Sequence, residues 1–432
     1  MIIVDRAIQQ RLDANQPIRI GIVGAGFSAR HIAAQILSAF PVIHLAVIVN
    51  RTPEHAQRAL ENAGAAEIRS VDDVSGLNKA IERGAHAITD NPQVLFDCER
   101  IDAVIETTGE VEYGAWVALQ TIRAGKHLIA LNCEMDATVG PWLKALADEQ
   151  GVIYTNTDGD EPGVAANLAR FVKTIGLDVV GAGNLKGFYD PYRTPETQAE
   201  FARQHNQKPR AVTSFVDGTK LSMELTVLAN GLGFGVGKRG MFGPSCDDVR
   251  HCLPAFPESA FTPERGIVDY LVGAAPHTGA FVIGHSEQPM KAEYLRYLKM
   301  GDGPFYVFHT PYHLPQLEVP ITVCRAVLLD DTTIAPLGPP CCDAITIAKR
   351  DLKAGETLDG IGGFTAYTLI DNMQTSIAEN LLPMGVSDGC VLRRDISKDS
   401  PITYDDVELP KARRIDEWRR AMITRFFPEA AT

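Results

Sequence analysis

Residues 18–30 constrain the fold of this chain more than any other segment. An apolar run leads into a Gly-x-Gly-x-x-Ala turn made by Gly24, Gly26 and Ala29, and a helical pattern follows over residues 31–40. In such a turn the first glycine permits a tight bend, the second lets a pyrophosphate approach the backbone, and the small third residue lets the helix pack closely. The flanking strand and helix favour a dinucleotide-binding turn over a purely structural one, because the helix start attracts phosphate oxygens. The predicted cofactor contacts in this turn are Gly24, Gly26, Phe27, Ser28 and Ala29.

The second apolar run, residues 44–49, indicates which dinucleotide is bound. Sites for NAD usually place Asp or Glu at the end of this strand, where it holds the ribose 2′-hydroxyl. This chain has Asn50, Arg51 and Thr52 there instead. Asn50 and Thr52 can donate hydrogen bonds to a 2′-phosphate, and the Arg51 guanidinium can pair with it and stack on adenine. The sequence therefore favours NADP(H), the alternative being that Arg51 is a solvated arginine before a helix.

Alternating strands and helices continue to about residue 155, which predicts a parallel sheet covered by helices on both faces. Ligands bind at the carboxyl ends of such strands. Thr107, Thr108, Gly109 and Asn132 follow two of the expected strands, so we expect them beside the nicotinamide half of the cofactor. Residues 60–100 form a long acidic and alanine-rich insertion, which we expect to fold as one or two helices of a lid.

Composition limits the function classes. The formal net charge of −13 over 432 residues argues against a general nucleic-acid surface. No run reaches the roughly 18 apolar residues of a membrane span. Eight cysteines in a chain of this length are no disulfide framework, and the adjacent pair Cys341 and Cys342 has no CxxC partner. The sequence therefore predicts a reduced, cytoplasmic protein that binds neither nucleic acid nor membrane.

The pattern changes after residue 155. An acidic turn, a helix, a strand and a glycine-rich stretch follow, and beyond about residue 337 short β-like pieces alternate with Asp and Gly before a basic amphipathic helix. The predicted fold class is α/β, in three domains. They are a doubly wound Rossmann-type domain (residues 1–155), an α+β catalytic and dimerisation domain (residues 156–336) and a small β-rich domain ending in a helix (residues 337–432).

The candidate chemistry lies in the middle domain. Lys220 and Glu224 are four residues apart, on one helix face. They form either an acid–base or substrate-orienting pair or a plain salt bridge, and we weigh these alternatives equally. Lys186, inside an apolar strand, is the cation that we expect to reach an anionic substrate. Other basic residues of this domain are weaker candidates, and His309 and His313 are possible proton carriers; the weaker cations are Arg193, Lys208, Arg210, Lys238 and Arg239.

The acidic turn carries Asp158, Asp160 and Glu161 within four positions. Clustered carboxylates suit Mg²⁺ or Mn²⁺, and such a metal would polarise a carbonyl oxygen. Acidic residues also favour the start of the helix that follows. We prefer the helix-start interpretation, so the metal ligands remain unassigned, while Asp160 and Glu161 are kept as catalytic candidates.

Three features together resemble homoserine dehydrogenase over roughly residues 18–235. They are the glycine fingerprint, the Thr-Thr-Gly strand end at residues 107–109, and the Gly-Asp-Glu-Pro-Gly turn at residues 159–163, with the run at residues 221–229 in support. The last domain resembles an SAF domain, on residues 348–356, 382–385 and 391–407. A chain with both parts resembles the DXR-like family.

The resemblance implies an NADPH-dependent enzyme that converts 1-deoxy-D-xylulose 5-phosphate to 2-C-methyl-D-erythritol 4-phosphate, in the supply of isoprenoid precursors, and a homodimer. The catalytic Asp and Lys of homoserine dehydrogenases align with Lys220 and Glu224, in swapped order, and Cys133 replaces another of their lysines. These departures argue against homoserine as substrate. The alternatives are a dehydrogenase of another small polyol or hydroxy acid, and an NADP-binding regulatory protein.

Overall fold

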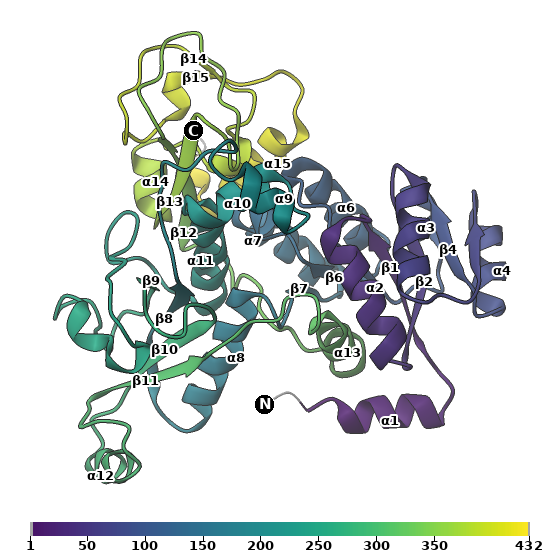
Figure 1. The fold of residues 1–432 in the computed structure, drawn as a ribbon, viewed down its shortest axis with the longest axis horizontal. Coiled ribbons are helices and arrows are strands. Elements are labelled where there is room, and N and C mark those ends of the chain that lie inside the picture. Colours follow the sequence, from purple (N-terminus) through teal and green to yellow (C-terminus); the bar gives the residue numbers. More distant parts are fainter. Residues whose placement is uncertain (1–2, 431–432) are drawn as a thin grey trace. The chain divides into compact units, whose positions relative to one another are not determined.

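The computed structural model describes residues 3–430, which fall into two compact units (Figure 1). The first comprises the residues up to Met135 together with Trp142–Asp160 and Leu314–Ala335. The second comprises Asp136–Pro141, Glu161–His313 and the residues from Pro336 onward. The three predicted domain ranges stay predictions. In the part of the chain described, no helix is both long and apolar enough to cross a membrane.

A seven-stranded parallel sheet forms the first unit, in the order β3-β4-β2-β1-β5-β6-β7. This order places the earliest strand at the centre and the later strands on either side, which confirms the predicted doubly wound sheet. The strands are β1 (Ile18–Val23), β2 (Ile43–Val49), β3 (Ile68–Ser70), β4 (His86–Thr89), β5 (Ala103–Glu106), β6 (His127–Ala130) and β7 (Tyr154–Asn156).

Helices cover both faces of this sheet because successive side chains of a strand point to opposite faces. Ile20 and Ile22 of β1 belong to one apolar core with Ile32 of the following helix. Val47 of β2 belongs to a second core with Leu77. The helices that contribute residues to this unit are α1 (Asp5–Asp13), α2 (Phe27–Ala39), α3 (Pro53–Asn62), α4 (Val74–Glu82), α5 (Pro92–Asp97), α6 (Val111–Arg123), α7 (Cys133–Gln150) and α13 (Val319–Leu329).

Residues 60–100 contain the two expected helices, but they also contain two strands that the sequence did not predict. This segment supplies β3 and β4, which pair in parallel with each other and with β2, as well as α4 and α5. It therefore extends the sheet at one edge. The two strands are only three and four residues long, too short to stand out in the sequence as apolar runs.

The second unit contains a four-stranded mixed sheet in the order β11-β10-β8-β9. Its central pair is antiparallel, whereas β8 and β9 run parallel. Helices α8 and α11 pack against β8, and this packing positions the candidate site described below. The elements are α8 (Glu161–Thr174), β8 (Asp178–Lys186), α9 (Ala199–Gln204), α10 (Pro209–Val216), α11 (Thr219–Leu232), η1 (Val249–His251), η2 (Leu253–Ala255), β9 (Ile267–Val272), β10 (Ala280–His285), α12 (Pro289–Tyr297) and β11 (Phe305–Thr310).

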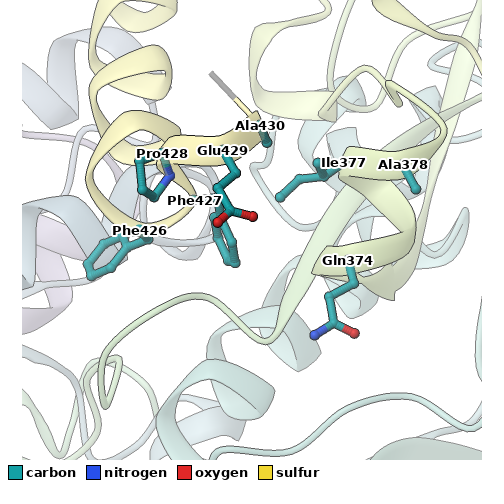
Figure 2. Close-up of a pocket in the computed structure, with 8 residues that line it drawn as sticks. All are labelled: Gln374, Ile377, Ala378, Phe426, Phe427, Pro428, Glu429 and Ala430. Atoms are coloured by element: carbon teal, nitrogen blue, oxygen red, sulfur yellow. The ribbon is translucent and has the colours of Figure 1, made fainter. Parts of the chain in front are cut away.

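The last part of the second unit is built from two small antiparallel sheets, as predicted. A pocket of about 390 Å³ lies beside its α14 and the end of α15, and no predicted site residue lines it (Figure 2). The elements are β12 (Cys342–Ala348), β13 (Ala366–Asn372), α14 (Met373–Ala378), η3 (Met384–Val386), β14 (Val391–Leu392), η4 (Tyr404–Asp406), β15 (Val407–Glu408), α15 (Arg414–Phe426) and η5 (Pro428–Ala430).

Candidate functional site

The glycine-rich turn joins β1 to α2 and has the geometry of a phosphate site. Gly24 has a φ of 109°, and a Cβ there would lie 2.7 Å from the Thr107 Oγ1, so the fold itself requires glycine. Gly26 differs, because a Cβ at that position would meet no atom within 4 Å. Gly26 is also the N-cap of α2, whose first turn receives no side-chain cap. The open space and the uncapped helix start fit a bound pyrophosphate.

The three predicted adenosine-side residues lie in the loop after β2, and they differ in what their side chains contact. The Asn50 side chain donates a hydrogen bond to the Thr52 carbonyl at 2.8 Å, so it braces the loop. Arg51 is exposed, and Thr52 is the N-cap of α3 without a side-chain cap bond. Arg51 is therefore the group of this loop best able to pair with a 2′-phosphate.

The predicted nicotinamide-side residues are largely engaged in holding loops. The Thr107 hydroxyl donates to the Val23 carbonyl at 3.0 Å, which ties the end of β5 to β1. Asn132 is buried; it caps α7 by accepting from the Met135 N–H and donates to the Glu110 carbonyl. Gly109 adopts a left-handed φ of 68° in the same turn. These contacts shape the carboxyl end of the sheet, and contact with a nicotinamide stays a prediction.

Glu106 is a buried acid that the sequence did not single out. Its Oε1 accepts hydrogen bonds from the N–H and hydroxyl of Thr108, and its Oε2 has no hydrogen-bond partner among the described residues. Burial raises the pKa of Glu106 to about 7, against the opposing effect of the Thr108 hydrogen bonds. The signal in the sequence was a carboxylate in a strand whose other residues are all apolar.

We expect Glu106→Gln to stabilise the protein at pH 7 by about 1–3 kcal/mol. The folded-state pKa, about 7, exceeds the ordinary value of 4.5, so the folded state binds more protons than the unfolded state between these values. Glu106 therefore contributes its full stabilisation below the unfolded-state pKa of 4.5. This stabilisation is lost as the pH rises through the folded-state pKa of about 7. Urea unfolding at several pH values measures the effect. Exposed Glu54→Gln is the control, and an equal gain in both variants would contradict the prediction.

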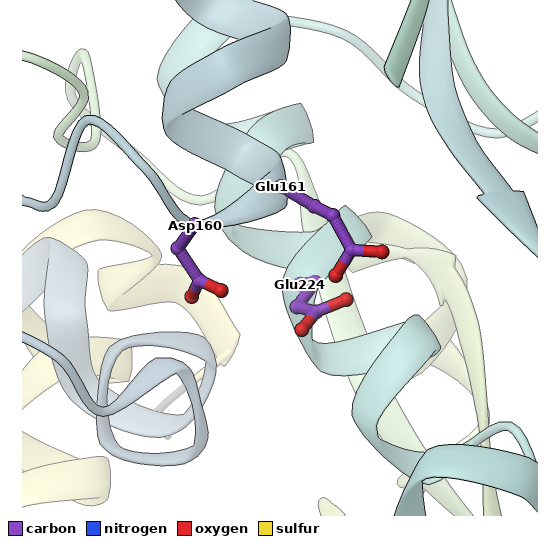
Figure 3. A group of neighbouring side chains, drawn as sticks. All are labelled: Asp160, Glu161 and Glu224. Carbon is purple, nitrogen blue, oxygen red and sulfur yellow. The ribbon is translucent and has the colours of Figure 1, made fainter. Parts of the chain in front are cut away.

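Four charged side chains meet in the second unit. Lys186 ends β8, Glu161 begins α8, and Lys220 and Glu224 lie on the first turns of α11. The Lys186 Nζ lies 2.7 Å from the Glu161 Oε1 and 3.5 Å from the Glu224 Oε2, and the Lys220 Nζ lies 3.6 Å from the Glu224 Oε1. Figure 3 shows the Glu161 and Glu224 side chains approaching one another from two helices. We call these four residues the lysine–carboxylate cluster.

The lysine and glutamate side chains of the cluster differ in their exposure to solvent. The Glu161 and Glu224 side chains are only 5% and 2% exposed, whereas those of Lys186 and Lys220 are 18% and 20% exposed. The ammonium-bearing side chains therefore reach the solvent side, and the carboxylates lie behind them. A negatively charged or electron-rich oxygen would meet the lysines first.

The charged groups of the cluster also shift the pKa values of one another. Burial alone would lower the pKa of Lys186, but the Glu161 and Glu224 carboxylates outweigh it and raise the pKa above its usual range. Lys186 is thus a permanent cation. Burial, followed by the neighbouring Glu161, raises the pKa of Glu224 to about 7, although Lys186 and Lys220 oppose the shift. The Asn184 amide donates to the Glu224 Oε2 at 3.0 Å. Glu224 can therefore change its charge near neutral pH.

The acidic turn does not form a ready divalent-cation site. Asp158 is fully buried and bound by Arg325 at 2.5 Å and by the Thr322 and Thr333 hydroxyls, which makes it structural. A carboxylate oxygen of Glu161 and one of Glu224 lie within 4.8 Å of each other, which is close enough for both to bind one cation. Asp160 is the residue directly before Glu161 in the chain. The Lys186 ammonium already occupies the cation position beside both glutamates. The donor set therefore fits a lysine rather than Mg²⁺ or Mn²⁺.

Most other basic candidates have partners away from the cluster. Arg193 pairs with Asp190, Arg210 donates to carbonyls at residues 359 and 361, and Arg239 pairs with Asp371 and Glu379. Lys238 lies over the Phe242 ring. His313 is nearer, with its Nε2 4.0 Å from the Glu161 Oε2. Lys186 and Lys220 remain the cations placed to meet a substrate anion.

Three protein-family models match the chain. Residues 18–134 match "Oxidoreductase family, NAD-binding Rossmann fold", residues 159–319 match "Oxidoreductase DRL, catalytic domain", and residues 345–408 match "SAF domain". All four cluster residues fall inside the second match. The third match confirms the expected SAF domain. The likeness to homoserine dehydrogenase and to the DXR-like family in particular stays a prediction.

Solved structures share parts of the fold at low identity. Levoglucosan dehydrogenase in complex with NADH and levoglucosan is 14% identical over 73% of this chain and 91% of its own, with a TM-score of 0.39. A putative NADPH-dependent oxidoreductase from Desulfitobacterium hafniense is 13% identical over 73% and 89%, with a TM-score of 0.40. Scores this low carry no argument about substrate.

The comparison with curated proteins gave no match. The boundaries of the family matches agree with the elements described above: the Rossmann match spans β1 to β6, and the catalytic match begins at the turn before α8. Three successive segments of the chain are therefore similar to the NAD-binding Rossmann fold of an oxidoreductase family, to the catalytic domain of oxidoreductase DRL and to an SAF domain.

Proposed function

We propose that this protein is an NADP(H)-dependent oxidoreductase of a small anionic hydroxycarbonyl compound. The observation that carries the proposal is the lysine–carboxylate cluster, which lies within the segment that matches an oxidoreductase catalytic domain. The nicotinamide cofactor supplies or accepts a hydride. The turn around Gly24 and Gly26 and the start of α2 are the groups that would hold its pyrophosphate.

The cluster provides the charge and the protons that carbonyl reduction needs. The Lys186 ammonium stabilises negative charge as it develops on the substrate oxygen, and it needs no reorganisation because Glu161 already holds it. Lys220 faces the solvent side and lies beside Glu224, so a proton can pass from a substrate hydroxyl to Lys220 while Lys220 gives one to Glu224. In the reduction step the transfers run in reverse: Glu224 gives a proton to Lys220, and Lys220 gives one to the reduced substrate oxygen.

Within this class we propose 1-deoxy-D-xylulose 5-phosphate as the substrate. Its carbon skeleton rearranges to an aldehyde with no net change of atoms or electrons. One hydride from NADPH and one proton then reduce the aldehyde to the alcohol of 2-C-methyl-D-erythritol 4-phosphate. The cluster has two partly exposed lysines and two buried carboxylates, and partial protonation of Glu224 near pH 7 leaves it a net positive charge that suits an anionic substrate. The match to the DRL catalytic domain supports an oxidoreductase reaction, and the choice of this substrate rests on the resemblance to the DXR-like family.

A dehydrogenase of another polyol or hydroxy acid is the second candidate. The match of residues 18–134 to a general oxidoreductase family favours it, since that match names no rearrangement. The lysine–carboxylate cluster serves plain carbonyl reduction equally well.

One incubation tests both candidates. The purified chain is mixed with NADPH and 1-deoxy-D-xylulose 5-phosphate, with and without Mg²⁺ or Mn²⁺. We expect loss of NADPH absorbance and a product with the mass of the reduced, rearranged phosphate. Oxidation of NADPH by other ketoses or aldehydes alone would support the second candidate. Tight NADPH binding with no turnover of any compound would overturn the enzyme assignment in favour of a regulator.

We expect Arg51→Glu to weaken NADPH binding by about 10- to 100-fold, the range of one charge-assisted hydrogen bond lost. NADH lacks the 2′-phosphate, so its affinity should change little. Fluorescence titration of both cofactors measures the two dissociation constants. Arg58→Glu, the same charge change at another exposed position near α3, is the control. Equal losses for NADH and NADPH would contradict a role of Arg51 in 2′-phosphate recognition.

A further inference from the structure

We propose that Lys349 of the SAF domain is a positioning residue for the lysine–carboxylate cluster and acts through helix α11. This inference deepens the proposed function and rests on it. It gives the SAF domain a role in catalysis: to hold the helix that carries Lys220 and Glu224.

The start of α11 depends on a buried charge. Asp217 is fully buried, and its Oδ1 accepts the Thr219 N–H at 2.9 Å, which satisfies one of the free donors at the helix start. Its Oδ2 accepts from the Lys349 ammonium at 2.8 Å. Without that partner Asp217 would be a buried unpaired carboxylate, which is costly. Lys349 therefore pairs with the buried carboxylate that accepts the first N–H group of α11.

Lys349 is itself fully satisfied. Its Nζ donates to three acceptors, each at 2.8 Å: Asp217, the Arg193 carbonyl and the Gly363 carbonyl. An ammonium group has three donors, so none is left over. The residue is only 4% exposed. One buried side chain thus joins the loop before α9, the start of α11 and the loop before β13.

Two further hydrogen-bonded contacts hold α11, one from the SAF domain and one from the residues just before it. The Ser222 hydroxyl donates to the Thr368 carbonyl of β13 at 2.9 Å. Near the helix end, the Asn230 Oδ1 accepts the N–H groups of Cys341 and Cys342 at 2.7 and 3.1 Å. Contacts at positions 217, 222 and 230 therefore run along the whole length of α11.

Lys220 and Glu224 lie between the first and the last of these contacts. The Glu224 side chain is directed to Lys186 and Asn184 of β8 and to Glu161 of α8, and Lys220 is its neighbour on the same helix. The distances from Glu224 to the Lys186 Nζ (3.5 Å) and to the Asn184 amide (3.0 Å) therefore require α11 to keep its position against β8. A shift of about 1 Å in a catalytic group commonly costs up to a hundredfold in rate.

The test uses three variants of the full chain. Lys349→Met removes the ammonium group, and the double variant Lys349→Met/Asp217→Asn removes both charges, so that no unpaired charge stays buried if the single variant fails to fold. Arg419→Met is the matched control. Arg419, in α15, is also a buried cation of the second unit. It pairs with Asp343 at 2.5 Å and donates to the Thr138 carbonyl, and its partners lie outside α11.

Two measurements are made on each variant. The first is kcat, KM and the NADPH dissociation constant with 1-deoxy-D-xylulose 5-phosphate. The second is the titration of the Glu224 carboxyl by difference infrared spectroscopy, where the band is assigned by its loss in Glu224→Gln. We expect the Lys349 variants to lower kcat about tenfold with unchanged NADPH affinity. Water entering beside a loosened α11 should also move the Glu224 titration toward its ordinary range by about one unit.

Three outcomes would overturn the proposal. They are unchanged kcat and titration in both Lys349 variants, equal changes in Arg419→Met, and a wild-type spectrum with no titrating Glu224 band. If the wild-type chain does not turn over the substrate, the proposed reaction fails, but the infrared titration still decides whether Lys349 positions the cluster.

Discussion

Replacement of Lys186 by methionine is expected to lower kcat for 1-deoxy-D-xylulose 5-phosphate reduction about a thousandfold. The variant removes the permanent cation that stabilises the substrate oxygen, a contribution worth about two to three orders of magnitude in comparable sites. It also leaves Glu161 and Glu224 facing each other without the ammonium group that lies 2.7 and 3.5 Å from them. Stopped-flow measurement of NADPH oxidation at saturating substrate reports the loss, while NADPH affinity should stay as in the wild type.

A matched control separates catalysis from stability. Lys126 is a buried lysine of the first unit, where its Nζ donates to the Cys98 carbonyl at 2.7 Å. Lys126→Met should reduce the free energy of unfolding without lowering kcat in the fraction that stays folded. If both variants lost activity in proportion to lost folded protein, Lys186 would be a structural residue. Partial recovery in Lys186→Arg would support the electrostatic role, since the charge is kept.

The first unit was predictable because its signals are local. The turn at Gly24 and Gly26 follows from residues that are neighbours in the sequence, and the apolar runs of β1, β2 and β5 are typical of strands buried on both faces. Short strands carry too little pattern to be recognised alone. For this reason the sequence did not predict β3 and β4, although it predicted helices in the same segment.

The members of the cluster were recognised, but their arrangement was not. Lys220 and Glu224 are four residues apart, so their contact follows from helix geometry. Glu161 and Lys186 are 25 residues apart, and only the packing of α8 against β8 brings them together. The sequence suggested a choice between metal ligands and a helix start for Glu161. The structure shows a third arrangement, in which Glu161 is a buried carboxylate paired with Lys186.

Long-range partners also explain the misjudged polar residues. Asp158 is one of the clustered carboxylates that suit either a metal or a helix start. In the structure it pairs instead with Arg325, which lies 167 residues later in the chain. Arg239 resembled a substrate anchor, but its partner Asp371 lies 132 residues away in the SAF domain. Glu106 is the converse case: its place at the end of an apolar strand hinted at burial, but only the packing of that strand shows that its carboxylate is enclosed. Charge pairing across domains is set by tertiary packing, which local patterns do not encode.

Glu224 controls the charge of the cluster near neutral pH, which gives the reaction a defined pH dependence. Its pKa of about 7 means that the carboxyl is mostly protonated below that value and ionised above it. In the proposed reaction the rearrangement begins with removal of a proton from a substrate hydroxyl, and an ionised Glu224 is needed to take this proton through Lys220. The rearrangement precedes the reduction, so kcat/KM should rise with pH and level off above about 7. Lys186 stays protonated throughout this pH range, so it does not contribute to the pH dependence of kcat/KM.

Glu224→Gln is expected to lower kcat about a hundredfold and to abolish the rise of kcat/KM through pH 7, because glutamine cannot accept the proton. Asp269→Asn is the matched control. Asp269 is a buried carboxyl of the same unit whose pKa is raised to about 6 by burial, but it accepts from the N–H groups of Phe242 and Gly243 and does not belong to the cluster. The control should keep the wild-type pH profile. A profile that persisted in Glu224→Gln, or vanished in Asp269→Asn, would assign the titration to another group and leave Glu224 as a holder of Lys186 alone.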